Sequence, residues 1–414
     1  MPGEKKVKIR VEDLTLIFGK KKQEALELLK EGVSKEEVLK KTKCTIGVNR
    51  ASFEIREGEI FVIMGLSGSG KSTLIRCLNR LNEPTSGKVF FNERDITRES
   101  NKELLDTRRN QMSMVFQKFG LLPHRNILEN TAFGMEIRGE EKEKREERAK
   151  RALATVGLQG YEMQYPSELS GGMQQRVGLA RALANDPEVL LMDEAFSALD
   201  PLIKSDMQDE LLEIQNKLHK TIVFITHDLD EAIKIGDRIA IMKDGVIEQI
   251  GTAEEILSSP ASDYVEAFVE KVDRKTIITA ESLMFKRNTL VQIHKDGPKG
   301  VLRKMRAVGT DLLPVEDENM KFMGYVWLQD LLVLEMEKET TIGKALKSDV
   351  PSVYKHYTVE DMLPLITGIR YPLAVVEEGS GRLLGMVSQT SLIVEATRFD
   401  HKEVTELKEK ANKI

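Results

Sequence analysis

A glycine-rich segment, Gly65–Ser72, carries the most specific chemistry in the chain. It reads Gly-Leu-Ser-Gly-Ser-Gly-Lys-Ser and lies between the mainly apolar runs Ile60–Met64 and Leu74–Leu78. We expect these runs to form a buried strand and a helix. A glycine-rich turn in this context points successive N–H groups at an anion, and the fit to G-x-x-x-x-G-K-[ST] predicts a phosphate-binding loop. The context disfavours the alternative, a Gly-Ser-rich turn without a ligand.

Two side chains of this loop are predicted to have separate roles. The Lys71 ammonium supplies a positive charge for the β- and γ-phosphates of a nucleoside triphosphate. The Ser72 hydroxyl is expected to ligate Mg²⁺, because this small cation prefers oxygen ligands. The residues expected to bind the nucleotide here are Gly65, Leu66, Ser67, Gly68, Ser69, Gly70, Lys71, Ser72 and Thr73.

A second apolar run, Val189–Met192, ends in two adjacent acids. We expect a buried parallel strand whose carboxyl end faces the ligand crevice. Asp193 is expected to hold Mg²⁺ through water, and Glu194 to polarise the attacking water as a general base. The alternative is a strand that ends in solvated charges, and the phosphate loop upstream favours the catalytic interpretation.

The segment Leu169–Arg176 narrows the choice among families that carry a phosphate loop. It reads Leu-Ser-Gly-Gly-Met-Gln-Gln-Arg and resembles the signature of ATP-binding-cassette (ABC) ATPases, with Met173 at a position where glutamine is commoner. We expect a helix from Gln174 to Ala184, whose N-terminus is another anion site. The resemblance implies that two copies of the chain sandwich two ATP molecules. Each copy would offer Ser170, Gly171 and Gly172 to the γ-phosphate held by the other.

Three further positions match ABC motifs. Gln117 resembles the Q-loop glutamine, which contacts Mg²⁺ and reports the nucleotide state to a transmembrane partner. Ser197–Asp200 resembles the D-loop, with Asp200 expected at the nucleotide. His227 follows the apolar run Ile222–Thr226 and resembles the switch histidine, which would hold the γ-phosphate and the attacking water in line.

Phe18 lies where the ABC family places an aromatic ring under adenine. It ends the first predicted strand, residues 7–18, and the next strand region is predicted over residues 46–64. Stacking on this ring would add affinity with little base specificity. A core phenylalanine at a strand end is the alternative.

An insertion at residues 20–46 separates these strands, where most ABC cassettes have a short hairpin. It predicts an amphipathic helix over residues 20–31, then a helix over residues 35–41 that begins with a capping box of Ser34 and Glu37. The insertion most resembles that of the ATPase subunits of glycine betaine and proline importers. A surface hairpin that packs on its own domain is the alternative.

Composition and apolar patterning are consistent with that family. The net charge of −5 disfavours a surface that coats nucleic acid, and two cysteines exclude a disulfide framework. The amino terminus lacks the apolar core of a secretory signal, and no apolar run approaches the roughly 20 residues that span a bilayer. We therefore expect a peripheral protein on the cytoplasmic face of the membrane, bound to a separate transmembrane permease that works with a substrate-binding protein.

Transport of carnitine or choline is an alternative. So is an ABC ATPase acting on nucleic acid or ribosomes, which would normally show a long coiled coil or a duplicated cassette.

A weak internal repeat follows the last of these motifs. The pair of predicted strands at Leu312–Asp317 and Met323–Val326 is echoed by the pair at Tyr371–Val376 and Leu384–Val387. A helix is expected after each pair. The repeat resembles a tandem of cystathionine-β-synthase-type (CBS) domains, a regulatory module that in betaine importers is linked to sensing ionic strength or cyclic di-AMP.

The usual nucleotide residues of CBS domains are divided between the two copies. The nucleotide pocket of CBS domains usually has a hydroxyl residue and, three positions later, an aspartate. Trp327 precedes Asp330 in the first copy, and Ser388 precedes Ser391 in the second. Neither copy has both residues, which argues against ordinary adenosine-nucleotide binding.

A basic helix face is the better regulatory candidate. Lys299, Arg303 and Arg306 are spaced i, i+4 and i+7, with Lys304 close by. Such a face attracts anionic lipid, and salt weakens the attraction, so ionic strength could act on it directly. A solvated basic face is the alternative. The apolar side of this helix is predicted to contain Val301, Leu302, Met305 and Val308.

The predicted fold class is thus an α/β P-loop NTPase cassette followed by an α+β tandem CBS module. The cassette, with a mixed sheet, is expected over residues 1–275 and its helical subdomain over about 117–185. The CBS repeats are expected over 276–337 and 338–398, and a tail over 399–414.

Overall fold

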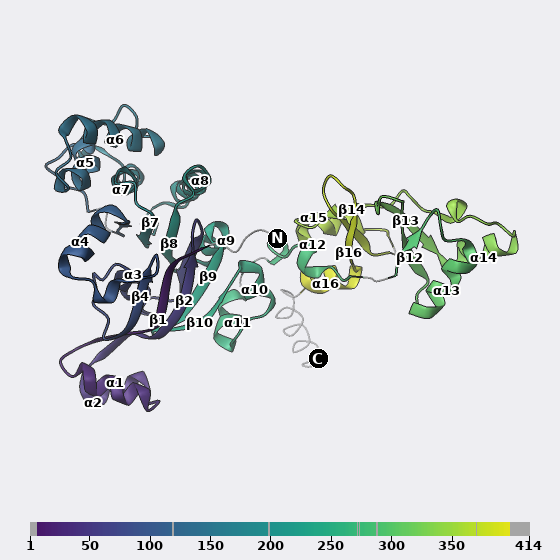
Figure 1. Cartoon of the computed structure of the whole chain (residues 1–414), viewed down its shortest axis with the longest axis horizontal. Helices are drawn as coiled ribbons and strands as arrows, with labels where there is room; N and C mark the ends of the chain where they lie inside the picture. Colours follow the sequence, from purple (N-terminus) through teal and green to yellow (C-terminus); the bar gives the residue numbers. More distant parts are fainter. Residues whose placement is uncertain are drawn as a thin grey trace, which may run out of the picture. The chain divides into compact units, whose positions relative to one another are not determined.

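The structure is a computed structural model that describes residues 6–117, 120–197, 199–270, 272, 274–286, 289–369 and 371–397. The predicted tail, 399–414, lies outside the described residues. The chain divides into two compact units, 1–269 and 270–414 (Figure 1). Among the described residues, no helix is both long enough and apolar enough to cross a membrane.

The first unit is built on two sheets. The larger has the strand order β10-β9-β3-β8-β7-β6, in which all neighbours pair in parallel except β9 and β10. Its strands are β3 (Ile60–Met64), β6 (Met112–Val115), β7 (Val189–Asp193), β8 (Thr221–Thr226), β9 (Arg238–Lys243) and β10 (Val246–Gly251). Every residue of β3, β7 and β8 is buried, as expected for central parallel strands.

The second sheet of this unit is antiparallel, with the order β2-β1-β4-β5. It consists of β1 (Val7–Phe18), β2 (Thr45–Arg56), β4 (Ser86–Phe91) and β5 (Arg94–Asp95). The predicted strand region 46–64 is therefore two strands, β2 and β3. A turn at Gly58, with a positive φ of 69°, separates them and moves the chain from one sheet to the other.

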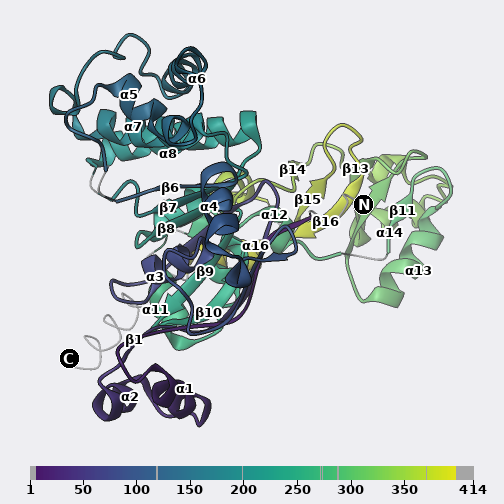
Figure 2. The ribbon, with the colours of Figure 1, turned by 60° about the vertical axis from the view of Figure 1, so that its left-hand side comes forward.

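The insertion forms two short helices, as expected, between β1 and β2. They are α1 (Lys22–Lys30) and α2 (Lys35–Thr42). Ser34 caps α2 by accepting a hydrogen bond from the Glu37 N–H at 3.3 Å, which is one half of the predicted capping box. Ala25, Val38 and Cys44 are buried together in a small core. Figures 1 and 2 show α1 and α2 at the end of the unit opposite α5 and α6.

The remaining helices of this unit surround the sheets. Helices α5 (Ile127–Ile137), α6 (Lys142–Thr155) and α7 (Gly171–Ala184) pack on one another as the helical subdomain (Figure 2). Helix α7 begins three residues earlier than expected, because Ser170 caps it. The others are α3 (Lys71–Leu78), α4 (Asn101–Asn110), α8 (Pro201–Leu218), α9 (Leu229–Ile235), α10 (Ala253–Ser258) and α11 (Asp263–Val269).

The second unit contains the expected repeat. Its two three-stranded sheets have the same plan, in which the first pair of strands is parallel and the second pair antiparallel. One consists of β11 (Val291–Gln292), β12 (Leu312–Glu316) and β13 (Phe322–Trp327), and the other of β14 (Ser352–Tyr354), β15 (Leu373–Val376) and β16 (Leu383–Val387). The helices are α12 (Ala280–Leu283), α13 (Pro298–Val308), α14 (Leu328–Met336), α15 (Val359–Met362) and α16 (Gln389–Thr397).

The opening segment of each repeat packs on the other repeat. The Ala280 N–H donates to the Tyr357 carbonyl at 2.7 Å, and the Phe285 N–H donates to Met386 at 2.9 Å. In the opposite direction, Lys347 exchanges two backbone hydrogen bonds with Tyr325, at 2.9 and 3.1 Å, and Ile342 lies in the core of the first repeat. The packing units therefore differ from the predicted ranges 276–337 and 338–398, which follow the order of the sequence. Residues 274–276 also pack on the second repeat, so the cassette ends before residue 275.

Candidate nucleotide site

The phosphate loop connects β3 to α3 and buries its lysine. The Lys71 side chain is only 4% exposed, and its Nζ donates to the carbonyls of Gly65 at 2.8 Å and Leu66 at 3.1 Å. Gly70 has a φ of 103°, and a Cβ there would lie 2.2 Å from the Gly47 carbonyl oxygen. Only glycine fits this position, because the loop turns back against the start of β2.

A cavity of about 440 Å³ opens beside this loop. It brings together nine predicted site residues from four separate parts of the sequence. They are Phe18, Ser67, Gly68, Gly70, Lys71, Ser72, Thr73, Gln117 and Glu194. Phe18 is 44% exposed at the end of β1, so its ring is available to a ligand, in contrast to the alternative of a core phenylalanine.

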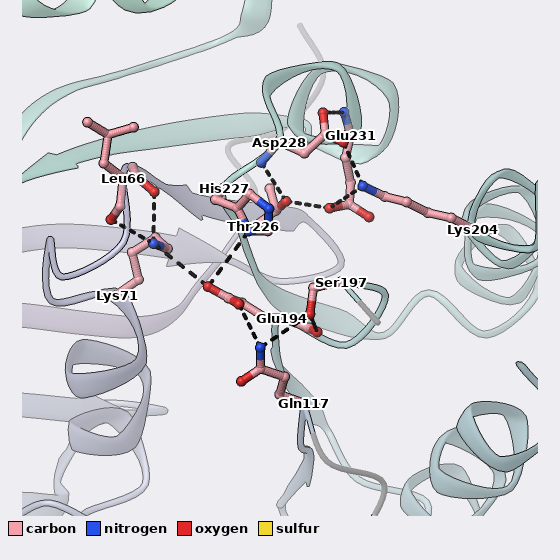
Figure 3. A network of polar contacts seen from close by, with 11 residues as sticks. Leu66, Lys71, Gln117, Glu194, Ser197, Lys204, Thr226, His227, Asp228 and Glu231 are labelled. Carbon is pink, nitrogen blue, oxygen red and sulfur yellow. Dashed lines mark hydrogen bonds and ion pairs between the residues drawn. The ribbon is translucent and has the colours of Figure 1, made fainter. Parts of the chain in front are cut away.

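Glu194 is the centre of the polar contacts at this cavity (Figure 3). Its Oε2 accepts a hydrogen bond from Gln117 Nε2 at 3.0 Å. Its Oε1 lies 3.9 Å from Lys71 Nζ and 3.9 Å from His227 Nδ1. The backbone of Glu194 has a φ of 48°, a left-handed conformation that is uncommon for a non-glycine residue. This turn directly after β7 places the carboxylate between lysine, glutamine and histidine.

Burial and the neighbouring carboxylates act in opposite directions on the charge of Lys71. Burial lowers the pKa of Lys71 below its ordinary value, although the carboxylates of Glu194 and Asp193 act in the opposite direction. A bound phosphate adds negative charge next to this ammonium and stabilises its charged form. The site is therefore suited to a polyphosphate.

The expected Mg²⁺ ligands provide oxygen atoms near the phosphate loop, although Asp193 is not among the residues that line the cavity. Asp193 ends β7 and is 2% exposed, while Ser72 and Gln117 line the cavity. Hydroxyl, amide and carboxylate oxygens are the ligands that Mg²⁺ takes together with phosphate and water. The residues present fit the ion. In this structure Asp193 Oδ2 is paired with Arg76 Nη2 at 3.1 Å, a partner that the sequence pattern does not indicate.

The signature residues do not line this cavity in the described part of the chain. Ser170 is exposed and caps α7, accepting a hydrogen bond from the Met173 N–H at 3.4 Å. A Cβ at Gly172 would lie 2.6 Å from Ile203 Cγ2, so a glycine here allows close packing on α8. Gly171 and Asp200 are also outside the cavity lining. The role of these residues at the γ-phosphate of a second copy stays a prediction.

Sequence reasoning missed Lys35 at the cavity. It is the first residue of α2 in the insertion, it lines the cavity with Phe18, and its Nζ lies 3.7 Å from Asp244 Oδ1. No motif marks this lysine. The only available signal was its place in an insertion that begins directly after the predicted adenine-stacking residue.

In the second unit, the structure modifies the predicted regulatory face. Lys299, Arg303 and Arg306 are exposed on α13, as expected. Lys304 is instead ion-paired with Asp296 at 2.7 Å. Val308, assigned to the apolar side, is 48% exposed because it is the last residue of the helix. The free basic face among the described residues therefore has three charges instead of four.

The side chains at the CBS nucleotide positions, which are divided between the two copies, make contacts with other residues of the protein. Trp327 packs edge-on against Tyr371, with ring centroids 5.6 Å apart. The hydroxyls of Ser388 and Ser391 bond to each other at 2.7 Å. Asp330 lies 3.7 Å from Lys347. These contacts are consistent with the expectation that ordinary adenosine-nucleotide binding is disfavoured here.

Comparison with known proteins identifies the family. The family model of the ABC transporter matches residues 48–197, and that of the CBS domain matches residues 342–397. The glycine betaine/carnitine transport ATP-binding protein GbuA of Listeria monocytogenes is 53% identical over 386 residues, which are 93% of this chain and 96% of GbuA. The chain belongs to the family of glycine betaine transport ATP-binding proteins. OpuAA of Bacillus subtilis, a glycine betaine transport ATP-binding protein, is 50% identical over 94% of this chain and 92% of OpuAA.

Solved structures support the ABC cassette part of this assignment. The dimeric structure of MJ0796, a bacterial ABC transporter cassette, has a TM-score of 0.51 and 30% identity, and covers 59% of this chain and 98% of MJ0796. A post-hydrolysis state of MJ0796 bound to ADP and Pi has a TM-score of 0.50. This glycine betaine transport ATP-binding family member is an ABC-type ATPase with an ATP-binding cassette and a CBS module.

Replacement of Phe18 by alanine in this ABC ATPase is expected to raise the Kd for ATP by about 5- to 160-fold, because one base stacked on an aromatic ring contributes about 1–3 kcal/mol. The Kd for GTP should rise by a similar factor, since stacking is not base-specific. Fluorescence titration with both nucleotides measures this. Phe18→Trp should retain tight binding, and unchanged ATP affinity in Phe18→Ala would rule out stacking.

Proposed function

We propose that this protein is the energy-coupling subunit of an importer for glycine betaine, proline or a related quaternary amine, including carnitine or choline. Its near full-length similarity to GbuA and OpuAA carries this proposal. In the importer it would bind a transmembrane permease at the cytoplasmic face of the membrane. A substrate-binding protein or domain would deliver the solute. ATP hydrolysis by this chain would then drive uptake without contact between the chain and the solute.

In the proposed mechanism, the chain's own residues position water against the γ-phosphate. Lys71 and the loop N–H groups hold the phosphates, and Glu194 accepts a proton from the attacking water as its oxygen bonds to the γ-phosphorus. His227 orients the water and the γ-phosphate. Mg²⁺, held by Ser72, Gln117 and Asp193, would neutralise charge on the phosphates. The bond from the γ-phosphorus to the β-phosphate oxygen breaks, giving ADP and phosphate.

A second copy of the chain would complete each site. Ser170, Gly171 and Gly172 lie away from the cavity of their own chain, at the N-terminus of α7, where N–H groups and the helix dipole favour an anion. The dimeric MJ0796 cassette supports this arrangement. ATP would therefore hold two copies together, and hydrolysis would release them.

Uptake by the reconstituted complex tests the proposed transport function. Liposomes that contain the permease, its binding protein and this subunit should accumulate labelled glycine betaine when ATP is inside. Competition by unlabelled proline, carnitine and choline would rank the substrates. A complex that hydrolyses ATP but accumulates none of these solutes would contradict the proposal.

We also propose that the CBS module regulates the importer, either through ionic strength or through cyclic di-AMP. The exposed charges of Lys299, Arg303 and Arg306 support the first mode, since a basic residue near anionic lipid contributes about 1 kcal/mol. The screening length falls from about 10 Å at 0.1 M salt to about 3 Å at 1 M. Salt would therefore release this face from the membrane.

Replacement of Lys299, Arg303 and Arg306 together by glutamine is expected to lower the salt concentration at which transport is half-activated, because less attraction must be screened. Transport in vesicles with anionic lipid, across a series of salt concentrations, measures this shift. A control that replaces Lys344, Lys355 and Arg382, which are ion-paired in the same module, removes equal charge elsewhere. Equal shifts in both variants would contradict a specific role of α13. If the salt response is unchanged and cyclic di-AMP still inhibits, the second mode is favoured.

A further inference from the structure

A partly buried polar cluster connects α8 to the chain around His227 (Figure 3). From α8, Lys204 Nζ lies 2.6 Å from Asp228 Oδ2 and 3.5 Å from Glu231 Oε2. Gln208 Nε2 of the same helix donates to Glu231 Oε1 at 3.1 Å. Glu231 is 4% exposed and the Lys204 side chain 17% exposed. Lys204 is thus the cation that compensates two acids at the start of α9.

The cluster fixes the backbone on both sides of His227. On one side, the Thr226 hydroxyl donates to the Glu231 carboxylate and accepts from the Asp228 N–H, the latter at 2.9 Å. On the other side, Asp228 caps α9 by accepting from the Glu231 N–H at 3.3 Å. The His227 side chain itself is 55% exposed, and its Nδ1 lies 3.9 Å from the Glu194 carboxylate. The position of the imidazole therefore depends on how its two neighbours in the chain are held.

Lys204 is one of the groups that lower the pKa of Asp228. Burial acts to raise the pKa of Asp228, but the hydrogen bonds from Lys204 and from backbone N–H groups outweigh it and hold the pKa below its ordinary value. Burial acts to lower the pKa of Lys204, and the bonds to Asp228 and Glu231 raise it above its ordinary value. Removing the ammonium would leave two neighbouring carboxylates, one of them almost fully buried, without a cation.

Lys204 also connects this cluster to the segment that precedes α8. Its backbone N–H bonds to the Asp200 carbonyl at 2.8 Å, so Lys204 lies in the first turn of the helix. Ser197, which precedes the helix, accepts a hydrogen bond from Gln117 Nε2 at 3.4 Å and donates to the Glu194 carbonyl at 2.9 Å. The start of α8 thus contacts the neighbours of His227 through Lys204, and Ser197, four residues before α8, contacts Glu194.

We propose that Lys204 is a positioning residue for ATP hydrolysis: by holding Asp228 and Glu231, it fixes His227 opposite Glu194 and couples the place of His227 to the start of α8. This inference rests on the proposed role of His227. In this role Lys204 itself does not contact ATP, the attacking water or Mg²⁺. A displacement of Ser197 would reach Glu194, and a displacement of Lys204 would reach the neighbours of His227.

The test compares Lys204→Met and Lys204→Arg in the full-length protein, with and without His227→Ala. Lys204→Met keeps the length of the side chain and removes its charge. We expect its kcat to fall by about 10- to 100-fold, as for a catalytic group displaced by about 1 Å, with the KM for ATP nearly unchanged. Lys204→Arg should restore most of the rate. In the His227→Ala background, Lys204→Met should cause no further loss.

A matched control removes another ion pair between the same helices. Lys234 of α9 lies 2.8 Å from Asp209 of α8 and also donates to the Ser205 hydroxyl at 3.1 Å, so it joins the two helices without holding the neighbours of His227. Lys234→Ala should retain the wild-type kcat, and thermal denaturation of both lysine variants shows whether lost stability explains a lost rate.

The outcomes separate the two proposals. If Lys204→Met lowers kcat by the same factor with and without His227, or if Lys234→Ala lowers kcat equally, the positioning role is overturned while the role of His227 stands. If His227→Ala alone keeps the normal kcat, the proposed role of His227 is wrong, and the inference about Lys204 is overturned with it.

Discussion

Replacement of Glu194 by glutamine is expected to lower the rate of ATP hydrolysis by about 10²- to 10⁴-fold, the usual contribution of a general base. The amide can still accept the hydrogen bond from Gln117, now 3.0 Å from Glu194 Oε2, but it cannot take a proton from water. ATP should therefore bind and remain uncleaved, and ATP-bound dimers should accumulate. Phosphate release and size-exclusion chromatography with ATP and Mg²⁺ measure the two effects.

Glu188→Gln is a control from the other end of the same strand. Glu188 lies directly before β7 and is paired with Lys8 at 2.8 Å, away from the cavity. Its loss should leave hydrolysis close to the wild-type rate. If Glu194→Gln hydrolyses ATP at the normal rate, Glu194 is not the base. If the rate falls but no dimer accumulates, hydrolysis does not require the sandwich that we propose.

Replacement of Lys71 by alanine is expected to abolish ATP turnover. Hydrogen bonds to charged groups contribute about 1.5–3 kcal/mol each, so loss of the ammonium should weaken ATP binding by about 10- to 100-fold. The stability of the protein without nucleotide should change little, because the variant loses the bonds to the Gly65 and Leu66 carbonyls but also removes a buried ammonium whose pKa the fold lowers. Nucleotide titration and thermal denaturation test these two expectations.

Lys35→Ala provides the matched comparison for Lys71→Ala. Both lysines line the cavity, but Lys35 is paired with Asp244 at its rim and is not part of the phosphate loop. We expect a smaller loss of ATP affinity and a normal kcat. Equal losses in the two variants would show that the cavity responds only to its total charge. Wild-type ATP affinity in Lys71→Ala would remove the phosphate role of Lys71.

The sequence predicted those parts of the site that depend on short-range pattern. A strand, a glycine-rich turn and a helix must occur within a few residues, so the loop Gly65–Ser72 could be located from residue order alone. Apolar runs that end in polar side chains located Asp193, Glu194 and His227 in the same way. Parallel strands then gather these ends at one edge of the sheet, and the structure places Glu194 within 3.9 Å of both Lys71 and His227.

Contacts between distant segments could not be predicted from such patterns. Arg76 on Asp193, Lys35 at the cavity and Lys204 on Asp228 each join charged residues from different elements. A charged side chain at a helix surface has the same local pattern whether it is solvated or paired. The left-handed backbone of Glu194 is likewise set by its surroundings, since glutamate has no local preference for it.

The boundaries of the CBS repeats could not be predicted for the same reason, because they depend on contacts between distant segments. The repeat in sequence located both pairs of strands, because alternation and turn residues are local features. It gave no sign that residues 278–285 add to the second repeat and residues 342–347 to the first. Both segments are short, and their apolar residues could pack on either sheet, so their local pattern does not specify which sheet they join.

The exchanged segments, residues 278–285 and 342–347, hold the two repeats together through backbone hydrogen bonds. The opening segment of each repeat pairs with the edge of the other repeat's sheet. Neither repeat can therefore unfold without breaking backbone hydrogen bonds to the other. A single protease cut in the connection at residues 338–341 should leave both fragments associated. A force applied to the chain near residue 270 would act first on the second repeat, because residues 274–276 and 278–285 pack on that repeat.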